Sequence, residues 1–410
     1  MTTTSAPTPL VVDMDGTLIR TDLLHESALA LLRQSFWAAL RIPLWLLRGK
    51  AAMKAEIARR VTIDPAALPY NQPLLDWLRV QKAQGRRLIL ATASDHHLAE
   101  RVAAHLGLFD AVWASDGSTN LAGAAKRAKL DAELGPRGYS YAGNSSADLH
   151  VWRGAASAVV VDAPAALLRA AQALTPIEHV EPRRPAGLRT WLKALRLHQW
   201  LKNLLIFLPP LAAHQFGNPS LWLVMATAFV AFGLTASSVY ILNDLLDLAD
   251  DRHHHRKRNR PFAAGTIPLL HGVLATPVLL AGAVLLCLWL PWQFALVLAA
   301  YYALTLAYSF WLKREAVIDV IALAMLYTVR ILAGAAAMHV VPSFWLLAFS
   351  MSLFLSLALL KRYAELDHLR RSAGDTPQEK AQMVRGRGYT VDDLDLLRSM
   401  GTATGYSSVL

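Results

Sequence analysis

The chain has 410 residues, of which 54% are hydrophobic and 17% charged, and its formal net charge at pH 7 is +11. This length favours two domains over one. The single cysteine, Cys287, excludes a disulfide framework and a cysteine-based metal site. The cations gather between long uncharged runs, so we interpret the positive charge as a membrane feature and expect no nucleic-acid partner.

Residues 1–185 have the composition of a soluble domain, and their first strand ends in two acids. The stretch MTTTSAPTPLVV lacks the basic start and long apolar core of a secretory signal, which predicts a cytoplasmic location. In LVVDMDGTL, Asp13 and Asp15 follow an apolar strand, and open α/β sheets bind ligands at that end of their strands. Asp13 is placed to attack phosphorus and Asp15 to protonate the leaving oxygen. A turn with capping acids is the structural alternative.

Residues 20–85 show helical patterns without strand alternation, which predicts a small helical cap. The segment SFWAALRIPLWLLRGK at 35–50 is apolar but short, and Arg41 and Pro43 interrupt it. Two interpretations are open for this segment. It packs into a core of the cap, or it lies against the bilayer surface as an interfacial helix.

Polar residues also follow the later strands. The strand RRLILATAS ends near Thr92, whose hydroxyl can bind a phosphate oxygen. The stretch NLAGAAKRAKL supplies Lys126 or Lys129 to balance phosphate charge. A third strand, within YSYAGNSSADLHVW, ends at Asn144, and Asp148 follows closely.

This order of acid, hydroxyl, lysine and acid resembles the haloacid dehalogenase (HAD) phosphatase superfamily over roughly residues 8–165. The resemblance implies a Rossmann-like α/β domain in which Asp13 is the nucleophile, Asp15 the general acid and base, Thr92 the phosphate-binding hydroxyl and Lys126 the motif lysine. It implies Mg²⁺ as cofactor, at Asp13, Asp15, Asn144 and Asp148. Asn144 stands where many members carry aspartate, and it offers only a neutral oxygen. A domain that only binds or scaffolds is therefore the alternative.

A stretch rich in Pro, Gly and charge at 175–190 predicts a hinge. The following WLKALRLHQWLKNLLIFLPP mixes Trp and cations with apolar residues, as amphipathic helices at a membrane surface do. We therefore expect a phosphatase-like domain at 1–180, a linker with an interfacial helix at 181–199, and an all-α transmembrane bundle at 200–410.

Six apolar runs in the C-terminal half predict membrane spans, because most reach the roughly 20 residues that cross a bilayer core as a helix. They lie at 203–213, 220–242, 267–290, 292–312, 316–338 and 341–360, and the first is short and contains Pro209 and Pro210. Lys and Arg occur only in alternate connections between these runs. By the positive-inside rule this predicts six crossings of the plasma membrane, with the N-terminal domain and the cation-rich loops in the cytoplasm.

The segment NDLLDLADDRHHHRKRNRP at 243–261 joins acids and bases directly after an apolar run. At 3.6 residues per turn, Asp244, Asp247 and Asp251 share a helical face, which also carries Asn243. Carboxylates at a membrane mouth are costly unless a cation neutralises them, and hard oxygen ligands suit Mg²⁺. The cations expected to hold phosphate oxygens follow at Lys257, Arg258 and Arg260. The segment therefore predicts a diphosphate site, whereas the three adjacent histidines do not share a face and do not predict zinc.

This motif after a membrane span resembles the UbiA superfamily of intramembrane prenyltransferases, over roughly residues 190–410. Most members carry a second Asp-x-x-x-Asp motif, but YSFWLKREAVIDVIALAM contains only Asp319. Together with HQWLKN and LLKRYAEL, these segments resemble the decaprenyl-phosphate phosphoribosyltransferase branch. That resemblance implies 5-phosphoribosyl diphosphate (PRPP) as donor, a polyprenyl phosphate as acceptor and a precursor of cell-wall arabinan as product.

The resemblance places the first metal site at Asn243, Asp244, Asp247 and Asp251. It implies phosphate binding by Lys202, Lys257, Arg258 and Arg260, with Tyr308, Lys313, Asp319, Lys361 and Arg362 as further pocket members. For the last five residues, ordinary anchoring at the cytoplasmic face is the alternative.

The fusion suggests the hypothesis that the phosphatase removes the 5-phosphate from the lipid-linked ribose. One alternative is a prenyltransferase with a prenyl diphosphate donor and an aromatic or other acceptor. Another is a HAD domain that only docks or regulates. Because UbiA-like bundles have nine spans, the chain, which ends in LLRSMGTATGYSSVL, is expected to lack the last ones. Homo-oligomerisation stays open.

Overall fold

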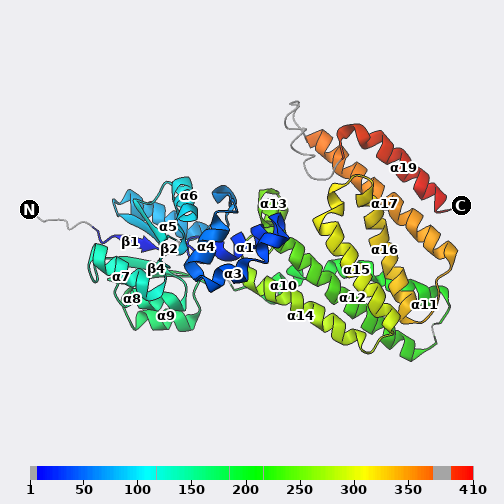
Figure 1. The fold of residues 1–410 in the computed structure, drawn as a ribbon, viewed down its shortest axis with the longest axis horizontal. Helices are drawn as coiled ribbons and strands as arrows, with labels where there is room; N and C mark the ends of the chain where they lie inside the picture. Colours follow the sequence, from blue (N-terminus) through cyan, green and yellow to red (C-terminus); the bar gives the residue numbers. More distant parts are fainter. Residues whose placement is uncertain (1–6, 117, 184, 216, 373–388, 410) are drawn as a thin grey trace, which may run out of the picture. The chain divides into compact units, whose positions relative to one another are not determined.

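The computed structural model describes residues 7–116, 118–183, 185–215, 217–372 and 389–409. The chain forms two compact units (Figure 1). The first combines Met1–Ala194 with Asp244–Val273, and the second combines Leu195–Asn243 with Leu274–Leu410. The segment that carries the aspartate motif therefore belongs to the same unit as the N-terminal domain.

A six-stranded parallel sheet forms the centre of the first unit. Its strands are β1 (Leu10–Val12), β2 (Leu88–Asp95), β3 (Ala111–Ser115), β4 (Ser140–Gly143), β5 (Ser157–Val161) and β6 (Ile177–Glu181), in the order β3-β2-β1-β4-β5-β6. In register, Val11 pairs with Ile89 on one side and with Tyr141 on the other. β1 thus lies where the strand order reverses, and open α/β sheets bind ligands at such points. The predicted α/β class is confirmed.

Helices cover both faces of this sheet (Figure 1). On one face, α5 (Gln72–Ala83) and α6 (His96–Leu106) pack over Leu10 and Val12. On the other, α7 (Gly123–Leu134), α8 (Leu149–Trp152) and α9 (Ala165–Gln172) pack over Val11. Because successive side chains of a strand point to opposite faces, a strand covered on both sides must be apolar throughout, as LVV is.

A small helical cap lies between β1 and β2 in the chain, as predicted. Its helices are α1 (Leu23–Gln34), α2 (Phe36–Ala39), α3 (Ile42–Leu47) and α4 (Lys50–Ala58), followed by the 3₁₀ turn η1 (Pro65–Ala67). Leu31, Trp45, Met53 and Ile57 belong to its own apolar core. Asp22 caps the N-terminus of α1, because its carboxylate accepts hydrogen bonds from the backbone N–H groups of the first turn.

The apolar segment at 35–50 leaves most of its large side chains exposed. Trp45 packs into the cap core, but Trp37 is 75% exposed, Leu44 61% and Leu47 84%. The cap core therefore accounts for Trp45 and, in part, for Ala38 and Ile42, but not for the exposed side chains. The exposed face is of the kind that interfacial helices present to lipid, so the structure favours the interfacial interpretation.

The first unit is completed by α10 (Leu188–Ala194) and by the segment after the second apolar run. That segment contains α13 (Leu248–His253) and the 3₁₀ turn η4 (Lys257–Asn259). The predicted continuous helix is interrupted, because α12 (Pro219–Leu246) ends before Asp247 and α13 begins after it.

The second unit is helical. After the 3₁₀ segment η3 (Leu197–Phe207) and α11 (Leu208–Ala212), it contains α12, α14 (Leu269–Cys287), α15 (Trp292–Phe310), η5 (Leu312–Arg314), α16 (Ile318–Ala337), α17 (Phe344–Ser372), η6 (Val391–Asp393) and α19 (Leu394–Ser407). α16 packs against α15, α17 and η3. Gly334 permits α16 to approach η3 closely, because a Cβ there would lie 2.0 Å from the carbonyl oxygen of Ile206.

The prediction of six membrane helices needs a correction. Among the described residues, five helices are long and apolar enough to cross a membrane: α12, α14, α15, α16 and α17. The run at 203–213 is divided between η3 and the short α11, where Pro209 and Pro210 occupy the first turn. Proline lacks a backbone N–H and is tolerated where a helix begins, so this run starts a new short helix instead of one long span.

Candidate active sites

Asp13 and Asp15 lie at the carboxyl end of β1, as predicted. The Lys126 Nζ donates to Asp13 Oδ1 at 2.7 Å, and the Asp13 side chain is 12% exposed. Gly16, at φ +73°, turns the chain after the two acids. A Cβ on Gly16 would lie 2.2 Å from Asn144 Nδ2, so the loops after β1 and β4 meet closely at this glycine.

Asp15 is held from two directions. Its Oδ1 accepts a hydrogen bond from the Leu23 backbone N at 2.8 Å. Its Oδ2 accepts from the Ser94 hydroxyl at 2.6 Å and from the Thr92 hydroxyl at 3.3 Å. Since side chains two residues apart on a strand point the same way, Thr92 and Ser94 both reach this carboxylate. Ser94 was not predicted, although its spacing from Thr92 along the strand could have indicated it.

A buried chain of hydrogen bonds joins the lysine to the last acid. The Lys126 Nζ donates to the Tyr141 hydroxyl at 2.9 Å, and that hydroxyl donates to Asp148 Oδ1 at 2.8 Å. Asp148 Oδ2 accepts from the backbone N of Asn144 at 3.0 Å and from both the backbone N and the hydroxyl of Ser145 at 2.9 Å. These hydrogen bonds from Asn144 and Ser145 to Asp148 fix the conformation of the loop that carries Asn144.

The structure distinguishes the two lysines left open by the sequence. Lys126 contacts Asp13, whereas the Lys129 Nζ lies 5.9 Å from the ring centroid of Trp113. Lys54 of the cap helix α4 was not predicted; its Nζ donates to the Ala93 carbonyl at 2.7 Å and to Asn120 Oδ1 at 3.1 Å. No sequence pattern around Lys54 marks it, because the cap and the core are distant along the chain.

Burial dominates the electrostatics of this site. It raises the pKa of Asp13 to about 7, although the Lys126 ammonium opposes the shift. Burial likewise raises the pKa of Asp15, and burial lowers the pKa of Lys54. The carboxylates thus lack full compensation of charge, and carboxylate and amide oxygens are the ligands that Mg²⁺ prefers. Asp13 and Asp15 fit a magnesium site in this respect, and the ligand roles of Asn144 and Asp148 stay predictions.

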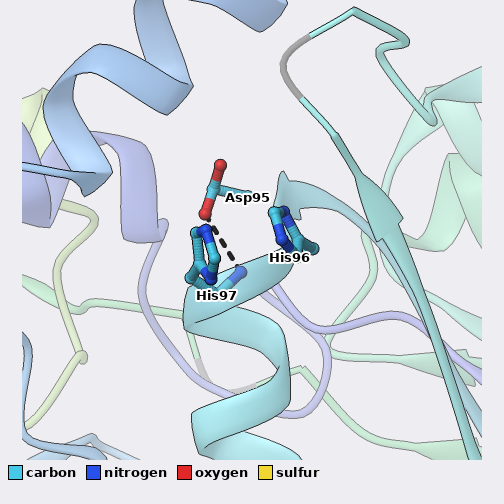
Figure 2. Close-up of side chains that lie close together, drawn as sticks. All are labelled: Asp95, His96 and His97. Atoms are coloured by element: carbon cyan, nitrogen blue, oxygen red, sulfur yellow. Dashed lines mark hydrogen bonds between the residues drawn. The ribbon is translucent and has the colours of Figure 1, made fainter.

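A second group of polar side chains lies at the start of α6 (Figure 2). Potential ligand atoms of Asp95, His96 and His97 all lie within 4.8 Å of one another. Asp95 Oδ1 accepts a hydrogen bond from the His97 backbone N at 3.0 Å, so the carboxylate caps the helix. This cap explains the position of Asp95 without a metal, and we assign no metal to the group.

The aspartate motif forms a compact cluster in the segment after α12. The Arg260 Nη1 lies 3.1 Å from Asp244 Oδ1 and 2.6 Å from Asp251 Oδ2, and the side chains of both acids are 2% exposed. Burial raises the pKa of Asp251, and Arg260 opposes the shift. Two buried carboxylates that share one cation fit the hard-oxygen donor set of Mg²⁺. The structure thus brings together two predicted metal ligands and one predicted phosphate ligand.

The remaining predicted residues of this motif have weaker structural support. Asp247 Oδ1 lies 3.9 Å from Arg33 Nη2 of helix α1. Asn243 is half-buried on α12, Lys257 is half-buried in η4, and Arg258 is exposed. Their roles as ligands stay predictions.

In the helical unit, three predicted pocket residues form one buried ion-pair cluster. Arg362 donates through Nε to Asp319 Oδ2 at 2.5 Å and through Nη2 to Asp319 Oδ1 at 2.9 Å. The Tyr308 hydroxyl donates to Asp319 Oδ1 at 2.7 Å. The cluster links α15, α16 and α17, so it holds these helices together. Lys313 is half-buried and Lys361 exposed.

We expect Asp319→Asn to destabilise the helical unit, because it removes the fully buried anionic partner of Arg362 and leaves the pair with Glu365, whose side chain is 41% exposed. Breaking a buried ion pair in this way costs about 3–5 kcal/mol. Unfolding of the detergent-solubilised chain, followed by circular dichroism, measures the loss. Asp367→Asn is the matched control, since Asp367 pairs with an Arg371 side chain that is 78% exposed; exposed pairs contribute less than about 1 kcal/mol. Equal losses in both variants would contradict this role of Asp319.

A second buried cation, Arg330 of α16, was not predicted. Its Nε donates to Asn203 Oδ1 at 3.0 Å, and its guanidinium lies 5.2 Å from the ring centroid of Tyr301 and 5.6 Å from that of Tyr327. The predicted Lys202 also faces Tyr327, at 5.4 Å. Among the described residues, Arg330 has no carboxylate partner and the Asn203 Nδ2 has no acceptor. A buried cation and a buried donor without an anion are suited to bind one.

Known proteins resemble both halves of the chain. A profile of haloacid dehalogenase-like hydrolases matches residues 10–153, and one of the UbiA prenyltransferase family matches residues 203–376. The uncharacterized protein y4nM of Sinorhizobium fredii is 40% identical over 404 residues, which cover 98% of this chain and 77% of that protein.

Two further relatives match over about half of this chain. The nodulation protein NoeC of Azorhizobium caulinodans is 38% identical over 224 residues, 54% of this chain and 69% of NoeC. A decaprenyl-phosphate phosphoribosyltransferase of Mycobacterium tuberculosis is 38% identical over 206 residues, 48% of this chain and 67% of that enzyme. The alignment with y4nM alone among these three spans nearly the whole chain.

Proposed function

Because the chain belongs to the UbiA prenyltransferase family and carries a haloacid dehalogenase-like hydrolase domain, we propose that it transfers 5-phosphoribosyl from PRPP to a polyprenyl phosphate. The family and the five apolar helices make the chain an integral membrane enzyme. The cations between its helices support a cytoplasmic location for the aspartate motif. The hydrolase domain contacts that motif through Glu26 and Arg252, so we place it on the same side. This placement requires the run of η3 and α11 to cross the membrane before α12 crosses back.

The observation that carries this proposal is the environment of Asp319. In the UbiA pattern a second Asp-x-x-x-Asp motif holds another magnesium at a prenyl diphosphate. Here Asp319 stands alone, and both of its oxygens contact Arg362 or Tyr308. This supports a donor that needs only the first acidic motif. The similarity to a decaprenyl-phosphate phosphoribosyltransferase supports PRPP as that donor.

In the proposed transfer, a phosphate oxygen of the lipid attacks C1 of ribose while the bond from C1 to the diphosphate oxygen breaks. Bound at Asn243, Asp244, Asp247 and Asp251, Mg²⁺ would supply neutralisation of the departing diphosphate. We assign Arg260, Lys257 and Arg258 to the oxygens of the diphosphate, since fixed cations stabilise charge that develops in the transition state. Arg330 and Lys202 are our candidates for the phosphate of the acceptor lipid.

The hydrolase domain would then remove the 5-phosphate of the lipid-linked ribose. Asp13 attacks the phosphorus and forms an aspartyl phosphate, while Asp15 gives a proton to the departing 5-oxygen. Water then attacks the aspartyl phosphate, with Asp15 taking its proton, and inorganic phosphate leaves. Thr92 and Lys126 would bind the phosphate oxygens.

The donor is tested by giving membranes that contain the chain labelled PRPP, polyprenyl phosphate and Mg²⁺. Label from PRPP in the lipid extract supports the proposal, provided that a labelled prenyl diphosphate supplied with an aromatic acceptor yields no product. If only the prenyl diphosphate yields product, the chain is a prenyltransferase in the narrow sense.

The exposed apolar face of the cap is expected to bring the hydrolase domain to its lipid substrate. In Leu44→Asp/Leu47→Asp, hydrolysis of the soluble substrate p-nitrophenyl phosphate should stay within about twofold. Dephosphorylation of the lipid-linked substrate in vesicles should fall by about tenfold or more, because two exposed leucines no longer enter the interface. Val80→Asp, an exposed apolar residue on α5, is the control. Equal losses on both substrates would contradict an interfacial role.

A further inference from the structure

A buried ion pair joins the hydrolase cap to the aspartate motif within the first unit. Arg252 of α13 and Glu26 of α1 form this pair through two contacts, one of them 3.1 Å long between Nη2 and Oε2. The two side chains are only 5% and 7% exposed. Thr21 adds a hydrogen bond from its hydroxyl to Glu26 Oε2 at 3.0 Å. The Arg252 Nε donates to the Ala263 carbonyl at 2.9 Å, so Arg252 also links α13 to the stretch that precedes α14.

More contacts extend this attachment along α1. The Arg33 Nη2 lies 2.6 Å from Asp250 Oδ2 and 3.9 Å from Asp247 Oδ1, and its Nη1 lies 3.4 Å from the Leu246 carbonyl. Arg33 thus contacts the chain where α12 ends and α13 begins. Helix α1 therefore contacts residues on both sides of the break in the motif.

The segment also contacts the first domain closely at Gly265. Gly265 has φ +67°, and a Cβ there would lie 2.5 Å from the carbonyl oxygen of Arg20. A glycine is required at this turn, because any side chain would push the segment away from the residues that precede α1. The attachment thus extends from the end of α12 to Gly265.

Buried ion pairs are costly to desolvate, and an apolar pair of similar volume often stabilises a fold as well. Their best-attested use is to fix one arrangement among several. Here the fixed residue, Arg252, directly follows Asp251, whose carboxylate shares Arg260 with Asp244. Holding Arg252 therefore holds the acid beside it.

We propose that helix α1 of the hydrolase domain is a positioning element of the transferase site, with Glu26 and Arg33 holding Asp244, Asp247 and Asp251 in their metal-binding arrangement. This inference rests on the proposed role of these acids in the transferase. It gives the hydrolase domain a second task, independent of its own chemistry. Transfer then requires the attachment of α1, whereas hydrolysis of a soluble phosphate ester does not.

The test compares charge-reversed variants of the full chain in membranes. We expect Glu26→Arg, Arg252→Glu and Arg33→Glu each to raise the Mg²⁺ concentration for half-maximal transfer by about tenfold or more, as loss of residues that orient metal ligands does. The double variant Glu26→Arg/Arg252→Glu should recover most of the loss. Asp76→Arg reverses a charge in the exposed pair between Asp76 and Arg79, and it should have no effect.

Two further measurements show whether a variant has lost the positioning of the metal ligands or has misfolded. The second of them does not depend on the proposed transfer reaction. Hydrolysis of p-nitrophenyl phosphate within about twofold of the unmodified chain shows that the hydrolase domain is folded. Tryptic cleavage after Arg256 and Arg258, which are exposed, should accelerate when the segment is released from α1 and slow again in the double variant.

The possible failures are distinguishable. Unchanged Mg²⁺ dependence in the single variants would overturn the positioning role, and so would the absence of recovery in the double variant. No transfer from PRPP by the unmodified chain would refute the proposed reaction instead. The tryptic rates then decide the inference, which fails if charge reversal leaves them unchanged.

Discussion

Asp244→Asn should reduce incorporation of label from PRPP into lipid by at least about 100-fold. The substitution keeps the volume of the side chain but removes one of the two buried charges that share Arg260. A site with one carboxylate fewer binds Mg²⁺ more weakly, so the departing diphosphate is less well neutralised. Scintillation counting of extracted lipid measures the effect, with the Mg²⁺ concentration varied to separate metal binding from turnover.

Two control experiments test whether the loss is specific to Asp244. Asp395→Asn changes an aspartate whose side chain is 88% exposed, and it should transfer label at the normal rate. Hydrolysis of p-nitrophenyl phosphate by the Asp244→Asn chain should also be normal, because the hydrolase site has its own acids. Full transfer by Asp244→Asn would show that this aspartate does not hold the donor.

Asp13→Asn should abolish release of the 5-phosphate and leave transfer intact, so that phosphoribosyl lipid accumulates. The amide has no charge with which to attack phosphorus, and it loses the strong ion pair with Lys126. Asp15→Asn should slow the same step by about 10²–10⁴-fold, the usual contribution of a general acid. Mass spectrometry of the lipid fraction distinguishes ribose with and without phosphate.

The control for this pair is Asp76→Asn, on the exposed surface of α5. It should release phosphate normally. If Asp13→Asn releases phosphate as fast as the unmodified chain, the domain acts by docking or regulation, which is the alternative that Asn144 leaves open.

Much of the hydrolase site could be predicted from the sequence, because its residues follow buried strands of one parallel sheet. Asp13, Thr92 and Asn144 each come directly after, or within, such a strand, and the sheet brings those strand ends together. The resemblances to haloacid dehalogenase-like hydrolases and to UbiA are confirmed by the profile matches. Local sequence was sufficient here because the acids and the hydroxyl are fixed to neighbouring strands.

Contacts between distant parts of the chain could not be predicted in the same way. Glu26 and Arg252 are 226 residues apart, and no sequence motif in either half predicts that they pair. The sequence placed Asp319 and Arg362 in one substrate pocket but did not indicate that they pair with each other. Charged residues in a helical bundle choose partners by three-dimensional packing, which periodicity along one helix does not determine.

The most direct test of the whole account uses PRPP that carries ¹⁴C in ribose and ³²P in the 5-phosphate. Membranes that contain the chain are supplied with this donor, polyprenyl phosphate and Mg²⁺, and the lipid is extracted. We predict ¹⁴C in the lipid with most of the ³²P released as inorganic phosphate, and equal amounts of both labels in the lipid from Asp13→Asn. The absence of ¹⁴C from the lipid would contradict the proposed transfer, and ³²P that stays with ¹⁴C in the unmodified chain would contradict the proposed hydrolysis.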